Sequence, residues 1–149
     1  MTGSWEPFGT TRRQPEPSAS PTAPSAEPAA APAPPPREPA RAVAVITCMD
    51  ARIDPLAVLG LRLGDANVLR NAGATVSDDV LRSLRSAVEL LGVRQAVLIG
   101  HTDCAGHGSD AAAAAAMADG ALRIRGAMGD AFGVEALMYD VASGTLTPL

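Results

Sequence analysis

Residues 42–47 read Ala-Val-Ala-Val-Ile-Thr, and this stretch predicts a β-strand that is buried on both faces. Its valines and isoleucine favour a strand, and no polar residue alternates with them, as one would in a strand with one face in water. Such a strand is typical of a parallel sheet that is covered by helices. Directly after it the chain becomes polar, in Cys48-Met49-Asp50-Ala51-Arg52.

Strand and helix patterns alternate downstream of this stretch. Residues 67–70 and 96–99 predict two further short strands. Asp54-Pro55 favours the start of a short helix, and Ser77-Asp78-Asp79 favours the start of a longer one, which has one apolar face and ends at Gly92. We therefore expect an α/β fold with a mainly parallel β-sheet flanked by helices and joined by right-handed crossovers.

The last third of the chain gives a weaker pattern. Residues 111–116 are all alanine, which favours a helix but offers little side chain to bury. Apolar residues then recur at a spacing of four from Ile124 to Phe132, which indicates a second helix. Residues 137–141 predict a final strand, followed by a turn at residues 142–144 and a short tail.

Residues 1–40 differ in composition from the rest of the 149-residue chain. They consist largely of Pro, Ala, Ser, Thr and Glu, with almost no Val, Ile or Leu, so they cannot bury enough apolar surface to offset the entropy of ordering. We expect a disordered Pro/Ala-rich tail over residues 1–40 and a folded domain over residues 41–149. The proline-rich run at residues 30–36 favours an extended spacer, or alternatively a docking site for a proline-recognition domain.

Charge and hydropathy exclude several classes of protein. The net charge is −4, every cation is Arg, and no basic patch is interleaved with aromatic residues, so we expect no nucleic-acid partner. No apolar run approaches the ~20 residues of a membrane span. Arg12 and Arg13 precede no apolar stretch, so we expect no secretory signal, and four glutamates in the first 40 residues argue against a transit peptide. A cytoplasmic location is the expectation.

Both cysteines follow predicted strands. Cys48 comes after the first strand, and Gly100-His101-Thr102-Asp103-Cys104 comes after the third. Because ligands of open α/β sheets collect at the carboxyl ends of strands, we expect Cys48, His101 and Cys104 to converge if the two strands are neighbours. Two thiolates and an imidazole suit zinc, and three protein ligands leave a fourth position open.

Asp50 and Arg52 add a charged pair to this site. Their spacing of two residues allows a charge-assisted pair that would lower the pKa of the carboxylate and keep it an acceptor. Together with a metal that activates water, these groups suit a zinc hydrolase or hydratase.

The two motifs resemble those of the β-class carbonic anhydrases. The linking segments at residues 69–73 and 86–93 are also similar to that family, and its short bacterial branch gives the nearest resemblance. The resemblance implies zinc on Cys48, His101 and Cys104, an Asp50–Arg52 dyad, and hydration of carbon dioxide to bicarbonate and a proton. It also implies a homodimer or larger assembly, and Asp50 as a fourth ligand in a closed state.

Other interpretations remain open at this stage. Residues 105–133 form a shorter segment than the family has, so a zinc-binding relative with an impaired pocket is one alternative. Hydrolysis of carbonyl sulfide or carbon disulfide is a second, and a disulfide or redox dithiol is a third. We expect His107 to face solvent in a glycine-rich loop and Asp103 to hydrogen-bond local backbone, without a role in chemistry.

Overall fold

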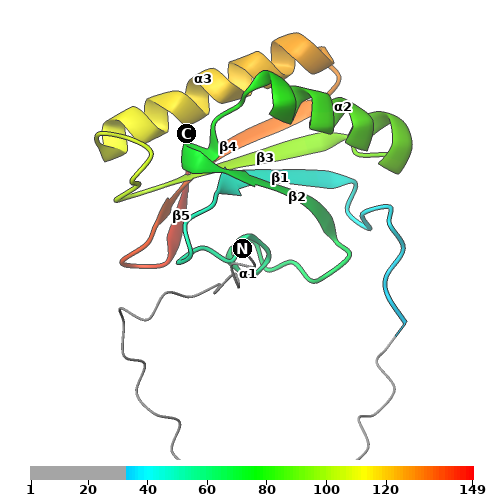
Figure 1. The fold of residues 1–149 in the computed structure, drawn as a ribbon, viewed down its shortest axis with the longest axis horizontal. Coiled ribbons are helices and arrows are strands. Elements are labelled where there is room, and N and C mark those ends of the chain that lie inside the picture. Colours follow the sequence, from blue (N-terminus) through cyan, green and yellow to red (C-terminus); the bar gives the residue numbers. More distant parts are fainter. Residues whose placement is uncertain (1–32) are drawn as a thin grey trace, which may run out of the picture. The chain divides into compact units, whose positions relative to one another are not determined.

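Five strands form one sheet in the order β2-β1-β3-β4-β5 in the computed structural model, which describes residues 33–149 (Figure 1). They are β1 (Val43–Cys48), β2 (Ala66–Asn71), β3 (Gln95–His101), β4 (Gly133–Asp140) and β5 (Thr145–Pro148). The first four strands are parallel, and β5 pairs antiparallel with β4. Most of the predicted disordered tail lies outside the described residues, and residues 34–149 form one compact unit.

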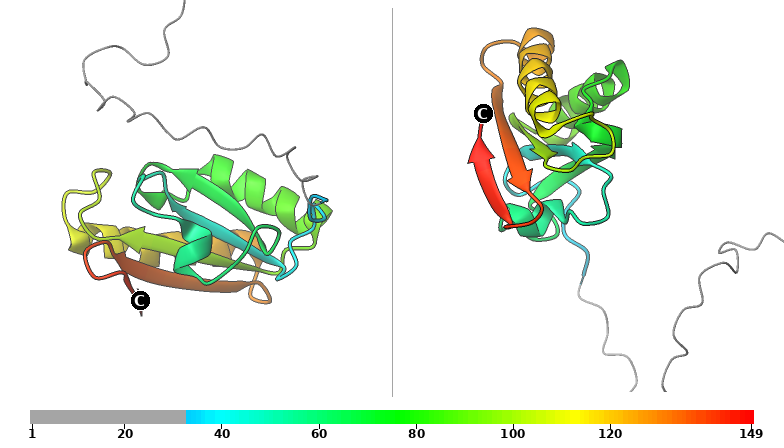
Figure 2. Two further views of the ribbon diagram at one scale, coloured as in Figure 1. Left: turned by 90° about the horizontal axis from the view of Figure 1, so that it is seen from below. Right: turned by 90° about the vertical axis from the view of Figure 1, so that its left-hand side faces the viewer.

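Two long helices, α2 (Asp78–Leu91) and α3 (Asp110–Met128), cover the same face of the sheet. The short helix α1 (Pro55–Val58) lies on the opposite face, which the two turned views of the ribbon also show (Figure 2). A serine hydroxyl caps α2, since Ser77 accepts from the Val80 N–H, and Gly92 ends it in the left-handed conformation at φ 71°. Among the described residues, no helix is long and apolar enough to cross a membrane.

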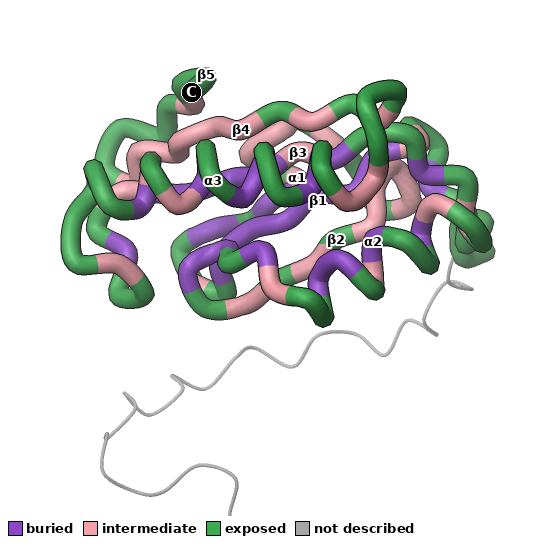
Figure 3. Tube along the Cα trace, turned by 90° about the horizontal axis from the view of Figure 1, so that it is seen from above, coloured by how far each residue is buried: buried purple, intermediate pink, exposed green. Residues whose placement is uncertain are grey.

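The core lies between this helical layer and the two central strands. Every residue of β1 is buried, and Leu98 of β3 has no exposed surface (Figure 3). Met117 and Ile124 of α3 are likewise fully buried in the same cluster. Helix α3 approaches β3 closely at Gly120, where an added Cβ would lie 2.9 Å from Leu98. Residues of both central strands thus share one buried cluster with residues of α2 and α3.

The structure confirms the predicted α/β class and the strands around residues 42–47, 67–70 and 96–99, and corrects the C-terminal third. The alanine run and Ile124 belong to a single helix, α3, which ends at Met128 because Gly129 adopts φ 87°. Phe132 therefore lies beyond the helix that its spacing suggested.

The end of the chain differs from the prediction as well. Strand β4 begins at Gly133, four residues before the expected start at 137, because its first residues pair with Gln95 and Ala96 at the start of β3. The predicted short tail is strand β5, which the turn at residues 141–144 folds back onto β4.

Candidate metal centre

The candidate site lies where the strand order of the sheet reverses. From β1 the chain crosses to β2 on one side, and from β2 it returns past β1 to β3 on the other. In doubly wound sheets, the crevice at this switch point, outside the carboxyl ends of the strands, is where ligands bind. Cys48 is the last residue of β1, His101 is the last residue of β3, and Cys104 follows three residues later. The fold therefore brings the three predicted ligands to the position that α/β sheets use for binding.

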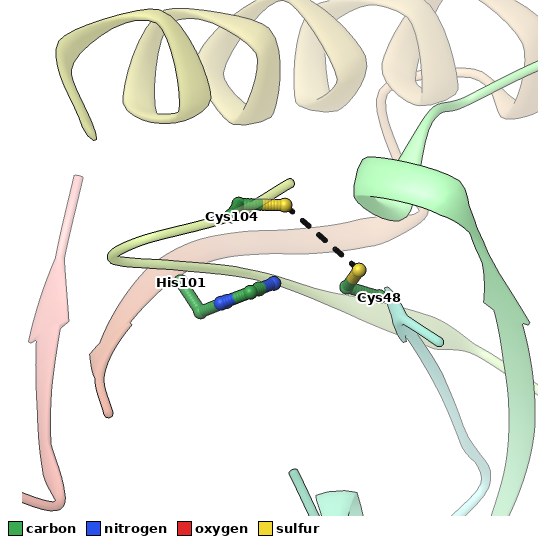
Figure 4. Close-up of side chains that lie close together, drawn as sticks. All are labelled: Cys48, His101 and Cys104. Atoms are coloured by element: carbon green, nitrogen blue, oxygen red, sulfur yellow. Dashed lines mark hydrogen bonds between the residues drawn. The ribbon is translucent and has the colours of Figure 1, made fainter. Parts of the chain in front are cut away.

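The three side chains point toward one another (Figure 4). Their sulfur and ring-nitrogen atoms all lie within 4.8 Å of one another, and all three residues are buried. The Cys48 and Cys104 sulfurs are 3.9 Å apart, and both cysteines are free, so they form no disulfide. Two thiolates on one tetrahedral zinc, each at ~2.3 Å, would be about 3.8 Å apart. The spacing of the sulfurs thus fits a shared zinc ion.

The imidazole of His101 is also oriented to bind a metal ion. Its Nδ1 lies 2.9 Å from the Thr102 carbonyl oxygen, which can only accept, so Nδ1 carries the ring proton. Nε2 is then unprotonated and carries a lone pair, and it is buried without a hydrogen-bond partner among the described residues. A buried unpartnered acceptor is costly, and a metal ion would satisfy it. The residues present therefore fit a zinc ion.

Charge also favours a cation here. Burial raises the pKa of the Cys104 thiol, and the neighbouring Cys48 adds to the effect. A metal ion held between the two sulfurs would offset this and keep both as thiolates. Two thiolates would in turn balance the two positive charges of zinc.

Asp50 and Arg52 form the expected pair in the loop that follows the ligand Cys48. The Arg52 side chain donates from Nε to Oδ1 of Asp50 at 3.0 Å and from Nη2 to Oδ2 at 2.8 Å, in a bidentate arrangement. The Arg52 backbone N–H also donates to Oδ1, at 2.9 Å. These hydrogen bonds hold the pKa of Asp50 well below its usual range, so the carboxylate is ionised at neutral pH.

A second carboxylate joins this pair, contrary to expectation. Asp103 accepts from Arg52 Nη1 at 2.8 Å, whereas the sequence suggested only a local backbone bond for its side chain. Asp103 adopts φ 53° in the loop between the two ligands His101 and Cys104. One guanidinium therefore connects the loop after β1 to the loop after β3. The left-handed backbone at Asp103 could not be foreseen from the sequence.

Arg70 and Gly73 support the site from the neighbouring strand. Arg70, within β2, donates to the backbone oxygens of Cys48, at 3.0 Å, and Asp50, at 2.7 Å. The Gly73 N–H donates to the Cys48 sulfur at 3.4 Å. No sequence motif predicts this amide donor, although the pairing of Cys48 with Asn71 in the parallel register places the turn beside the sulfur.

His107 is the other residue for which the expectation was wrong. It is half-buried, and its Nε2 lies 2.9 Å from the Gly73 carbonyl oxygen. The glycine-rich loop packs on the turn after β2, so His107 does not point into solvent.

The profile of the carbonic anhydrase family matches residues 43–126, more than half of the chain. The chain therefore belongs to the carbonic anhydrase family, and its curated relatives place it in the β class. The matched residues include all three candidate ligands and the Asp50–Arg52 pair.

Individual relatives agree with this assignment. The chain is 52% identical over 62 residues to β-carbonic anhydrase 1 of Mycobacterium tuberculosis, which is 42% of this chain and 38% of that protein. It is 41% identical over 64 residues to a carbon disulfide hydrolase of Saccharolobus solfataricus, covering 43% of this chain and 31% of that one. The chain thus matches well under half of the length of these curated relatives.

Solved structures match over a longer span. The carbonic anhydrase of Streptococcus mutans superposes with a TM-score of 0.67 at 29% identity, covering 74% of this chain and 82% of that one. The fold around the site is therefore shared well beyond the stretch of high sequence identity.

Proposed function

We propose that this protein catalyses the zinc-dependent, reversible hydration of carbon dioxide to bicarbonate and a proton. The observation that carries the proposal is the convergence of Cys48, His101 and Cys104 within 4.8 Å, beside a carboxylate already paired with Arg52. Membership of the carbonic anhydrase family and the likeness to the mycobacterial enzyme support the same activity.

Each residue has a distinct role in this proposal. Cys48, His101 and Cys104 would hold the zinc ion, which, when bound, lowers the pKa of water to near ~7. Asp50, kept ionised by Arg52, offers a hydrogen-bond acceptor that orients water at the mouth of the site. Arg52 fixes Asp50 and neutralises its charge. Release of Asp50 from Arg52 would free it to act as a fourth ligand in a closed state.

The Asp50→Ala variant tests this role for the carboxylate. We expect the zinc-loaded variant to keep its metal and to lose about 100-fold in kcat/KM for carbon dioxide hydration, because a positioned acceptor contributes about 10²–10⁴-fold. Stopped-flow hydration at pH 8.5, with metal content measured on the same preparation, gives both values. Asp119→Ala, an exposed carboxylate on α3, is the matched control and should keep full activity.

Two results would contradict the proposal. Unchanged turnover in Asp50→Ala would show that the Asp50–Arg52 pair has no role in catalysis. Stoichiometric zinc without turnover in the unmodified chain would instead support a catalytically impaired zinc protein, in which the short segment at residues 105–133 leaves the pocket incomplete.

Carbon disulfide or carbonyl sulfide hydrolysis is a second candidate function. The 41% identity over 64 residues to a carbon disulfide hydrolase favours it. The same ligands and dyad would serve, since these substrates are also linear molecules with an electrophilic central carbon. Hydrogen sulfide release from carbon disulfide, compared with carbon dioxide hydration at equal protein concentration, separates the two candidates.

A homodimer or larger assembly is part of the proposal. Strand β2 is an edge of the sheet, and the large apolar side chains of Val68 and Leu90 beside it are 37% and 74% exposed. Covering them in a second copy would bury apolar surface that the single chain leaves in water. We also propose a cytoplasmic location, because both cysteines are free thiols in a site that needs them reduced.

A further inference from the structure

The loop that follows Cys104 packs against the turn that follows β2. This turn is the 3-10 segment η1 (Ala72–Ala74). A Cβ added at Gly106 would lie 3.0 Å from both Cα and N of Gly73, so the two backbones are in direct contact. His107 then reaches over the turn, with Nε2 2.9 Å from the Gly73 carbonyl oxygen. A carbonyl oxygen only accepts, so Nε2 of His107 carries the proton in this hydrogen bond.

Gly73 connects this histidine to a metal ligand. Its N–H donates to the Cys48 sulfur at 3.4 Å, while its C=O accepts from His107. Only the φ and ψ angles of Gly73 separate these two peptide units, because each unit is itself planar. Holding the carbonyl therefore restricts the Gly73 backbone, and with it the directions that the N–H can take.

The turn has an unusual backbone that needs such support. Gly73 adopts φ 68°, and Ala74 adopts φ 53° directly after it. Glycine adopts this left-handed conformation without strain, but it costs roughly 1–2 kcal/mol for a residue with a Cβ, so the local chain alone does not favour it at Ala74. His107 supplies an anchor from a separate loop.

We propose that His107 is a positioning residue of the metal site. By donating to the Gly73 carbonyl, it keeps the Gly73 N–H on the Cys48 sulfur. A hydrogen bond to a ligating sulfur withdraws electron density from it, so His107 sets how strongly the Cys48 thiolate donates to the metal. His107 is itself no ligand here, because the cluster of potential ligands among the described residues holds only Cys48, His101 and Cys104. This inference rests on the metal site of the proposed function.

Three substitutions separate the hydrogen bond from mere packing. His107→Ala removes both the ring and the donor, His107→Phe keeps a ring without a donor, and His107→Gln offers an amide N–H close to the position of Nε2. Each full-length variant is loaded with Co²⁺, whose thiolate-to-metal charge-transfer band reports the electron density on sulfur. Zinc affinity is measured in parallel by competition with a chromophoric chelator.

We expect the band to move to longer wavelength in His107→Ala and in His107→Phe, because the sulfur becomes more electron-rich. His107→Gln should return it to the wild-type position. Zinc affinity should fall by about threefold to tenfold in the two variants without a donor, less than the about 10–100-fold typical of groups that hydrogen-bond a ligand directly.

A wild-type band in His107→Phe would overturn the inference, because ring packing alone would then suffice. The inference would also be overturned if the charge-transfer band of His107→Gln shifted as far as that of His107→Ala. Failure of the wild-type chain to bind Co²⁺ would overturn the metal site itself, and with it the proposed function. If His107→Ala does not fold, the comparison of His107→Phe with His107→Gln still decides the question.

Discussion

The two central strands and the C-terminal layer of the molecule are built differently. Every residue of β1 and most of β3 are buried, whereas no residue of β4 or β5 is fully buried. The end of β1, the end of β3 and the loop after β3 carry the three candidate ligands, and the layer of α3, β4 and β5 carries none. The site is thus held by the most constrained part of the fold.

This difference separates metal binding from the rest of the pocket. The ligand geometry depends on β1, β3 and the loops directly after them. In the C-terminal layer, Met117 of α3 and Met138 of β4 support β3, since both lie within 3 Å of a Cβ added at Gly100. We therefore expect changes in the central strands to disturb stability and metal together, and changes on the outer surface of α3 to disturb neither.

A matched pair of leucines tests this contrast most strongly. Leu98 of β3 is completely buried, and Leu122 of α3 is 65% exposed. We expect Leu98→Ala to lower the free energy of unfolding by about 3 kcal/mol, through lost burial and the cavity left behind. Leu122→Ala should change it by less than about 0.5 kcal/mol. Urea denaturation of the zinc-loaded chain measures both, and equal effects would remove the distinction between the two regions.

Two glycines of α3 allow the buried and exposed sides of one helix to be compared. At Gly120 an added Cβ would lie 2.8 Å from Val76 and 2.9 Å from Leu98, whereas at Gly126 it would meet nothing within 4 Å. Gly120→Ala should therefore destabilise the fold by about 1–3 kcal/mol through overpacking. Gly126→Ala should stabilise it by about 0.5–1 kcal/mol, because alanine restricts the unfolded chain and favours the helix. A stabilising Gly120→Ala would show that α3 does not pack on the sheet as described.

The smallest effect is expected at the turn between β4 and β5. The N–H groups of Ser143 and Ala142 donate to Asp140 and lower its pKa below the ordinary value of 3.8. A carboxylate with a depressed folded-state pKa contributes stability above its unfolded pKa, and this contribution is lost as the pH falls through the folded value. Asp140→Asn should thus lower the Tm slightly at pH 7 and not at all near pH 2. An equal difference at both pH values would contradict this account.

Much of the central region could be predicted from the sequence. The apolar run at residues 42–47 predicts a strand that is buried on both faces, and the structure confirms this prediction. Neighbouring strands and helices exclude water from it. Ser77 and Gly92 mark the ends of α2 by local chemistry that needs no tertiary contact. Cys48, His101 and Cys104 could be grouped because parallel strands end at the same edge of a sheet.

The remainder depends on contacts between segments distant in the chain. Strand β5 has only the sequence Thr-Leu-Thr-Pro, and it is a strand because β4 presents an open edge to it. The alanine run has no distinct apolar face that would fix the extent of a helix. It forms one continuous helix with Ile124 because this helix packs on β3 and β4. The bonds of Asp103 to Arg52 and of His107 to Gly73 arise from loop conformations that residue type alone does not dictate.

Zinc content per chain, measured on the wild-type protein and on Cys48→Ser, decides whether Cys48, His101 and Cys104 form a metal centre. We expect about one zinc per wild-type chain, held through dialysis, and nearly none in Cys48→Ser, because two ligands no longer make a stable site. A wild-type chain without zinc, or a Cys48→Ser chain that retains it, would contradict the metal centre described above.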